Sequence, residues 1–194
     1  MEKHIEYEEK QLSYDEMHAY LKIQNKNPNM VQMSNIRIVF SDPISYLCLF
    51  EKVEGFPLKY SDKISINQLD RLISELYQSL DIIHQCHYYV DVDHIFIEGS
   101  KDDWKRITFN RNYNPGNDDT YYRNVHRLAY LIYCVIVESP PENNPNSYVP
   151  RNIKELIQAS IDEHHEYEKH LTFLLWIFTE EPTTKWILEK LNVK

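Results

Sequence analysis

The sequence predicts a mainly helical protein of the α+β class. Six segments carry the sequence signals of α-helices, whereas only four short runs are rich in β-branched and aromatic residues. The 194 residues are 42% hydrophobic, which is enough for one sizeable core. Because no internal repeat or linker interrupts the pattern, we expect a single domain over residues 1–194.

The first predicted helix covers residues 14–25. Ser13 is followed three residues later by Glu16, which is the spacing of a capping box, and apolar residues then recur at helical intervals. Two β-rich runs follow, at residues 36–40 and 46–53. The Ser-Asp-Pro sequence between them is typical of a turn, so these runs predict a β-hairpin.

The clearest helical pattern begins near residue 66. Ser65 and Gln68 have the spacing of a second capping box, and six apolar residues follow on one helix face. These are Leu69, Leu72, Ile73, Leu76, Leu80 and Ile83. Beyond this helix, residues 95–97 and 107–109 are short β-like runs joined by a polar turn, which predicts a second hairpin.

The remaining third of the chain predicts a central helix and three peripheral ones. Residues 110–119 carry loop signals at nearly every position. Residues 125–137 are apolar almost all round, so this helix should lie at the centre of the core. Further helices are expected at residues 152–161, at residues 170–179 and after Pro182.

Composition disfavours several functional classes. The 21 Lys and Arg residues against 30 Asp and Glu give a net charge of -9, which disfavours a nucleic-acid partner. With only 3 glycines, at Gly55, Gly99 and Gly116, no glycine-rich phosphate-binding loop can form. The 3 cysteines lie in apolar runs, which indicates reduced, buried thiols. No apolar run is long enough to span a bilayer, so we expect a soluble intracellular protein, cytoplasmic or nuclear, without a membrane partner.

Four short motifs occur in order along the chain: NPNMV at 27–31, YLCLFEKVEG at 46–55, NVHRLAYLIY at 124–133 and EPTTK at 181–185. In order, they resemble the HPNIV turn after the αC helix, the fifth strand and hinge, the DVWSLGVILY helix and the terminal DPxxR turn of protein kinases. The resemblance covers residues 14–191. It implies a truncated kinase-like domain, with a helical C-lobe at residues 61–194. Residues 1–60 would be an N-lobe remnant and hinge, reduced to an αC helix and a β-hairpin.

The resemblance also implies that the parts needed for phosphoryl transfer are missing. That reaction needs a loop and a lysine for the phosphates, an Asn and an Asp for magnesium, and a catalytic carboxylate. Residues 1–13 contain no glycine and are expected to form neither the loop nor the lysine strand, which leaves Glu16 without its family partner. If His94 is aligned with the metal-binding Asn of kinases, Tyr89 takes the position of the catalytic Asp. If Asp91 is instead kept at the position of the catalytic Asp, the catalytic loop is two residues too short.

The position of the kinase Asp-Phe-Gly motif also lacks residues that phosphoryl transfer needs. Phe109 and Asn110 stand there, without the Asp that holds magnesium or the Gly that turns the chain. We therefore expect no catalytic residue, no cofactor and no bound metal.

Two groups of metal-binding residue types offer a competing interpretation as zinc sites. The first is His84, Cys86, His87 and His94, and the second is Glu163, His164, His165, Glu166 and His170. Neither has well-spaced ligand pairs, so we favour structural roles for the first group and a solvated surface for the second. A third group consists of tyrosines near the former cleft, where they would fill the volume of a nucleotide or contact a partner. They are Tyr88, Tyr89, Tyr113, Tyr121, Tyr122 and Tyr130.

These observations predict a catalytically inactive pseudokinase, not an enzyme, that acts as a protein-binding or regulatory module. Such a module would modulate a kinase or assemble a complex. The alternatives are an unrelated, mainly helical protein-interaction domain and an atypical nucleotide-dependent phosphotransferase.

The expected partner surface is the N-terminal face. Because nothing in the sequence can build the three strands that cover αC and the hinge in a kinase, the apolar side of residues 17–23 and the strand edge at 36–40 should lie open. A protein partner, such as a kinase, or a second copy would complete this face. The candidate contact residues are Leu21 and Ile38, with Tyr113, Tyr121 and Tyr122 as a secondary set.

Overall fold

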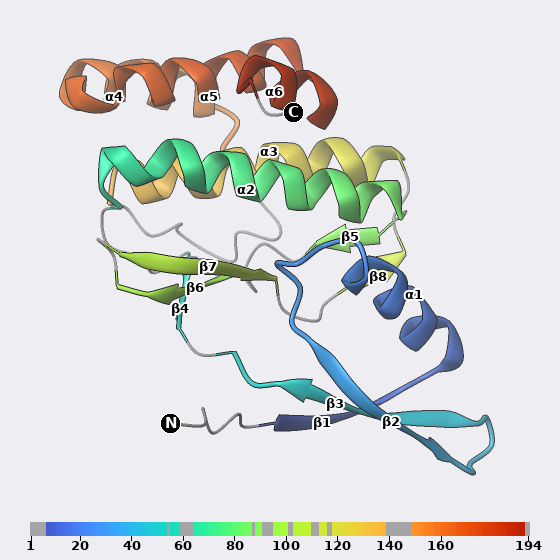
Figure 1. Ribbon diagram of the computed structural model, residues 1–194. Coiled ribbons are helices and arrows are strands. Elements are labelled where there is room, and N and C mark those ends of the chain that lie inside the picture. The colour runs from blue at the N-terminus through green and yellow to red at the C-terminus, as the bar shows by residue number, and fades with distance from the viewer. Residues whose placement is uncertain are drawn as a thin grey trace.

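The computed structural model describes nine stretches of the chain: residues 7–53, 55–58, 64–86, 88–90, 95–100, 103–109, 113–115, 118–138 and 149–192. Within them, two long helices form a layer between a group of C-terminal helices and the strands (Figure 1). A small sheet with one helix lies at the far end of the molecule from the C-terminal helices (Figure 1). The architecture is α+β and mainly helical, as the sequence predicted.

The N-terminal sheet has three antiparallel strands in the order β1-β3-β2. They are β1 (Tyr7–Leu12), β2 (Met33–Val39) and β3 (Ser45–Glu51), and helix α1 (Tyr14–Gln24) lies on one side of them (Figure 1). The predicted hairpin and helix are confirmed. The capping box is confirmed too, because the Glu16 backbone N–H donates to Ser13 Oγ and the Glu16 carboxylate accepts from the Ser13 backbone N–H.

Strand β1 was not expected from the sequence, which predicts no strand ahead of the first helix. It pairs with β3 along its whole length, from Tyr7 opposite Glu51 to Leu12 opposite Tyr46. Its sequence, YEEKQL, has little β-propensity of its own. The strand therefore depends on pairing with β3, which a local pattern cannot reveal.

Helix α2 (Ile66–Gln85) lies beside the second predicted hairpin. All six apolar residues of the predicted helix face are buried. The predicted capping box is wrong, because the Ser65 side chain makes no capping hydrogen bond. The predicted hairpin, β6 (Ile95–Gly99) and β7 (Trp104–Phe109), is confirmed, and β7 packs on α2.

Two short pairings were not predicted. Strand β4 (Phe56–Pro57) extends the second hairpin to the order β4-β6-β7, and β5 (Tyr88–Val90) pairs with β8 (Tyr113–Pro115). Strands of two or three residues carry no periodicity. Their positions depend on the elements around them rather than on their own sequence.

Helix α3 (Asp118–Ile136) is the central helix that the sequence predicted, and it begins within the segment expected to be a loop. Its residues Leu131, Ile132 and Val135 are buried, with exposed fractions of 0%, 0% and 3%. It packs against α2 and against α5 (Glu168–Glu180). The Asn- and Asp-rich sequence before residue 120 favours turns locally, so its helical start was missed.

The C-terminal helices agree with the prediction to within a few residues. They are α4 (Ile153–Glu163), the 3-10 turn η3 (His165–Tyr167), α5 and α6 (Thr184–Lys190). Helix α4 packs on α5, and α6 packs on α2. No helix in the described part of the chain is long and apolar enough to cross a membrane.

The cysteines behave as the sequence predicted. Cys48, Cys86 and Cys134 are all buried and free of disulfide bonds. Burial raises the pKa of Cys48 above its ordinary value and that of Cys134 to about 11. Both thiols are therefore protonated near neutral pH and contribute packing rather than chemistry.

Candidate functional site

The apolar side of α1 is covered within this chain, which corrects the expectation that it lies open. Met17, Tyr20 and Ile23 are buried. The Tyr20 ring meets the Phe50 ring edge-on at 5.0 Å, and the Tyr20 hydroxyl donates to the Val31 carbonyl oxygen at 2.8 Å. Burial raises the pKa of Tyr20, so this hydroxyl stays a donor. Strand β3 and the turn after α1 thus supply the cover expected from another chain.

Leu21, predicted as a partner contact, is only half-buried and packs against the core. Substitution there would disturb the fold as well as the surface. Ile38, the other principal candidate, is 57% exposed on β2. Ile38 is therefore a surface residue, whereas Leu21 lies at the edge of the core.

Exposed hydrophobic side chains concentrate in the N-terminal part. Ten large ones are exposed among the described residues, and six lie before residue 45. These six are Tyr7, Tyr14, Ile36, Ile38, Phe40 and Ile44, and the other four are Ile66, Tyr122, Leu156 and Trp186. Phe40, just after β2, is 89% exposed. Such a concentration on so small a part of the chain makes it the candidate interaction surface.

The strand register shows how this surface is built. Ile36 lies opposite Cys48 and Ile38 opposite Tyr46, so both isoleucines share the sheet face that α1 covers elsewhere. The Tyr14 ring on α1 lies 6.0 Å from the Tyr46 ring. We call Tyr14, Ile36, Ile38 and Tyr46, on adjoining parts of α1, β2 and β3, the β2 surface.

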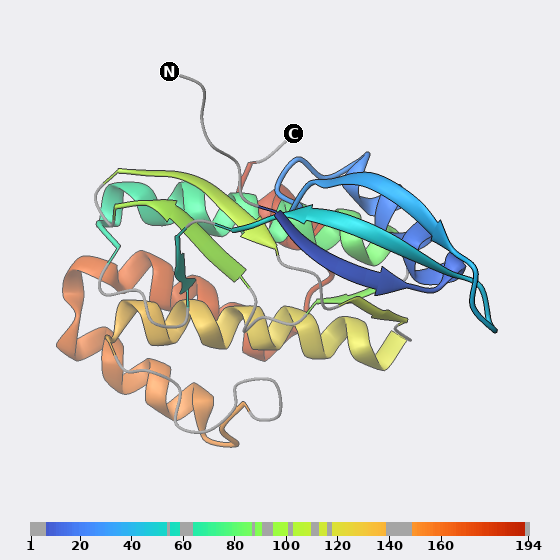
Figure 2. The same cartoon turned by 90° about the horizontal axis from the view of Figure 1, so that it is seen from below.

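Strand β2 is also an edge strand, as the order β1-β3-β2 requires. Seen from below, the sheet lies in front of α1 (Figure 2). A bulge at Asn35, where φ is 47°, interrupts the register, and pairing with β3 is regular again from Ile36 to Val39. The regular part of the edge therefore coincides with the exposed isoleucines.

Strand β1 places a lysine where the sequence analysis expected none. Lys10 lies opposite Cys48, on the sheet face turned toward α1. The pKa of Glu16 is lowered by hydrogen bonds from the Ser13 backbone and side chain and, to a smaller extent, by the charge of Lys10. The expectation that residues 1–13 form no strand with a lysine beside α1 is therefore wrong, although these residues contain no glycine.

The residues that the kinase resemblance aligns with catalytic positions are only partly within the described chain. Asp91, His94 and Asn110 lie outside it. The backbone of Tyr89 lies in β5 and that of Tyr113 in β8, where Tyr113 is opposite Val90. The side chains of these two tyrosines are outside the described residues.

Phe109, which the kinase resemblance aligns with the Asp-Phe-Gly motif, is 1% exposed and held by hydrogen bonds of its backbone. Its N–H donates to the Asn29 carbonyl at 2.8 Å, and its carbonyl accepts from the Val31 N–H at 3.3 Å. Arg106 on the same strand donates to the Met30 carbonyl at 3.0 Å. This strand end attaches the turn after α1 to the rest of the molecule.

Tyr121 belongs to a buried polar cluster and is not available to a partner, which corrects its assignment as a contact residue. It is 8% exposed, and its ring lies 3.6 Å from the ring of His84. Its hydroxyl donates to Thr184 Oγ1 at 3.0 Å and accepts from the Thr184 backbone N–H, while Thr184 Oγ1 donates to Asp81. Tyr122 is 44% exposed and remains a candidate contact.

The structure describes part of the first group of residues that was considered as a zinc site. The ring of His84 lies against that of Tyr121 at an interplanar angle of 39°, Cys86 is buried, and His87 and His94 lie outside the described residues. Among described residues, no cluster of three or more His, Cys, Asp or Glu is arranged to hold a metal.

His170, expected on a solvated surface, is buried instead. Its Nε2 lies 3.0 Å from Asp70 Oδ1, and Lys169 Nζ lies 2.9 Å from Asp70 Oδ2. Burial lowers the pKa of His170, and the hydrogen bond with Asp70 opposes that shift without cancelling it. This pair attaches α5 to α2.

Comparison with solved structures identifies the fold. A chain from the complex of Neurospora crassa PAN2 (WD40-CS1) with PAN3 (pseudokinase and C-term) is 12% identical, with 97% of this chain covered and a TM-score of 0.64. The protein spans 52% of that chain. The Cydia pomonella granulovirus kinase PK-1 is 15% identical, with 80% of this chain and 71% of that chain covered and a TM-score of 0.51. No protein-family model and no curated protein matches. The fold is therefore kinase-like, which disfavours an unrelated helical domain.

Proposed function

We propose that this protein is a kinase-like domain without catalytic activity that binds another protein through its N-terminal face. The observation that carries the proposal is the β2 surface, where exposed Ile36 and Ile38 lie on an open strand edge. An exposed apolar edge strand favours association with another chain. One structural neighbour comes from a complex of a pseudokinase with another protein, which supports a binding role for a domain of this fold.

The absence of catalysis is proposed from the residues at the family's chemical positions. Tyr89, His94 and Phe109 with Asn110 replace the groups that would act on phosphate or hold magnesium. None of the three glycines lies in residues 1–13, so this segment supplies no glycine loop ahead of α1. Burial of Phe109 is consistent with a packing role at one of these positions.

The partner class follows from the surface and the charge. A β2 surface of aliphatic and aromatic side chains suits the apolar centre of a protein interface. The net charge of -9 disfavours nucleic acid and favours a partner with a basic rim. A kinase that this domain modulates, or a component of a complex that it assembles, fits this description.

The test compares two isoleucine substitutions. Ile38→Glu places a charge on the β2 surface, and Ile66→Glu is the matched control, because Ile66 is 38% exposed at the start of α2. Each variant is first shown by circular dichroism and thermal unfolding to be folded. In affinity capture, the proteins that bind to the wild type and to Ile66→Glu should not bind to Ile38→Glu. Equal capture by all three chains would mean that the partner binds elsewhere.

A nucleotide-dependent phosphotransferase remains a second candidate because of Lys10. That residue lies on a strand beside α1, where the family resemblance puts the phosphate-binding lysine. A phosphotransferase would bind Mg-ATP, and this binding would depend on Lys10. The proposed binding module would not bind Mg-ATP.

A further inference from the structure

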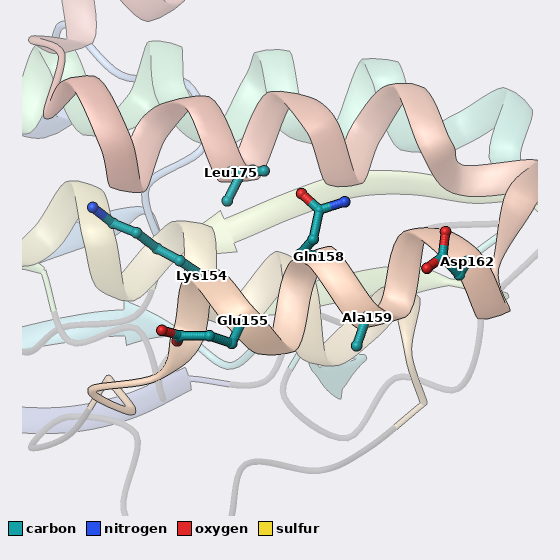
Figure 3. A pocket seen from close by; sticks show the side chains of 6 residues that line it. All are labelled: Lys154, Glu155, Gln158, Ala159, Asp162 and Leu175. Carbon is teal, nitrogen blue, oxygen red and sulfur yellow. The ribbon is translucent and has the colours of Figure 1, made fainter.

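A second surface feature lies far from the β2 surface, at the opposite end of the molecule (Figure 1). A groove of about 520 Å³ runs between α4 and α5 (Figure 3). Its lining residues are Lys154, Glu155, Gln158, Ala159 and Asp162 from α4 and Leu175 from α5. The five from α4 are exposed, and Leu175 is half-buried. The groove thus has a polar rim and a small apolar floor.

Three of the lining residues form one stripe along α4. Lys154, Gln158 and Asp162 are spaced four residues apart, so they lie on one helix face over roughly 12 Å. Figure 3 shows Lys154 and Asp162 toward the two ends of the groove, with Gln158 between them pointing toward Leu175. The stripe therefore carries a cation at one end, an amide in the middle and an anion at the other end.

The two charges are placed against the dipole of their own helix. Lys154 lies in the first turn of α4, where the dipole is positive, and Asp162 lies in the last turn, where it is negative. Neither makes a hydrogen bond or ion pair with another described residue. A helix running in the opposite direction beside α4 would place the complementary charge next to each of them.

We infer that the groove binds α4 of a second copy of this chain, antiparallel, about a twofold axis near Gln158. Lys154 then faces Asp162 of the second copy, and the same ion pair forms a second time by symmetry. The two Gln158 amides meet at the axis, where each can donate and accept one hydrogen bond. Ala159 has no bulk to keep the helices apart, and Leu175 of each copy loses its remaining exposure.

The interface predicted in this way is small. Helix α4 has 11 residues, and a stable interface buries on the order of 800 Å² per partner. The net charge of -9 on each copy also opposes association. We therefore expect a weak dimer, with a dissociation constant on the order of 10 to 500 µM. Since the β2 surface lies at the other end, a dimer would present two such surfaces and bind a multivalent partner more tightly than one chain.

The experiment is sedimentation equilibrium of the full chain over this concentration range. The wild type should self-associate, and Lys154→Glu or Asp162→Lys alone should raise the dissociation constant about tenfold or more, since two ion pairs become two repulsions. The double variant Lys154→Glu/Asp162→Lys restores both pairs with reversed polarity, so it should return to within about threefold of the wild type. Glu189→Lys on α6 has the same net charge as Asp162→Lys, so it is the charge control for that variant and should leave association no weaker than in the wild type.

Three results would overturn this inference. They are a wild type that stays monomeric throughout the range, single variants that associate as well as the wild type, and a double variant no better than the single ones. A dimer that Ile38→Glu abolishes and Lys154→Glu does not would also refute the α4 pairing. It would place self-association on the β2 surface and leave the proposed function standing.

Discussion

Leu131→Ala tests whether α3 is the centre of this fold. Leu131 is 0% exposed, within a helix that packs on both α2 and α5. The substitution removes three carbon atoms, which costs about 2.4 kcal/mol at about 0.8 kcal/mol per buried carbon. Incomplete collapse of the cavity adds to this, so the expected loss in the free energy of unfolding is about 2 to 5 kcal/mol.

Urea unfolding followed by circular dichroism measures the loss, and Leu156→Ala is the matched control. Leu156 is 37% exposed on α4, so its truncation should cost about 1 kcal/mol or less. The melting temperature of Leu131→Ala should fall by roughly 4 to 20 °C, at about 2 to 4 °C per kcal/mol for a chain of this length. Similar losses at both leucines would refute the assignment of α3 as the central buried helix.

Two further predictions concern polar contacts of the helical part. Tyr121→Phe removes the hydroxyl that bonds Thr184, so urea unfolding should show a loss of about 1 to 2 kcal/mol, and an unchanged midpoint would mean that the cluster contributes nothing. The pKa of His170 is lowered by burial, so stability present above its ordinary value of 6.5 should be lost as pH falls below that value. The pKa of Asp70 is also lowered, because hydrogen bonds from Lys169 and His170 outweigh burial, so a second loss should follow below about pH 3.8. Urea midpoints between pH 7 and 5 should decline less in His170→Gln than in the wild type, and equal slopes would contradict this assignment.

The helices were predictable because each buries a face long enough to show a period. Leu69 to Ile83 on α2 and the apolar run of α3 follow this rule, and both lie where the sequence put them. The capping box at Ser13 is equally local and was also predicted. These features depend on residues within one or two turns of each other.

The missed features depend on contacts between distant residues. Strand β1 exists because it pairs with β3 almost forty residues away, and this pairing brings Lys10 beside α1. Alternation of Lys10 and Leu12 toward α1 with Glu9 and Gln11 away from it was the available signal, but six residues are too few to stand out.

The candidate contact residues divide in the same way. Exposure of Ile38 followed from its place on a strand edge, whereas burial of Tyr121 depends on Thr184, 63 residues further along the chain. The burial of His170 likewise depends on α2, from which Asp70 reaches it. A single sequence gives no sign of either pairing.

We propose that this kinase-like domain binds protein and not nucleotide. Calorimetric titration of the full chain with Mg-ATP up to millimolar concentrations tests it most directly, with Lys10→Met measured alongside. We expect no heat beyond dilution. Thermal unfolding of the same samples should show no rise in melting temperature, because a ligand that bound only the folded state would raise it. Saturable binding that EDTA abolishes and that Lys10→Met weakens would mean that the domain binds nucleotide, and it would favour the phosphotransferase.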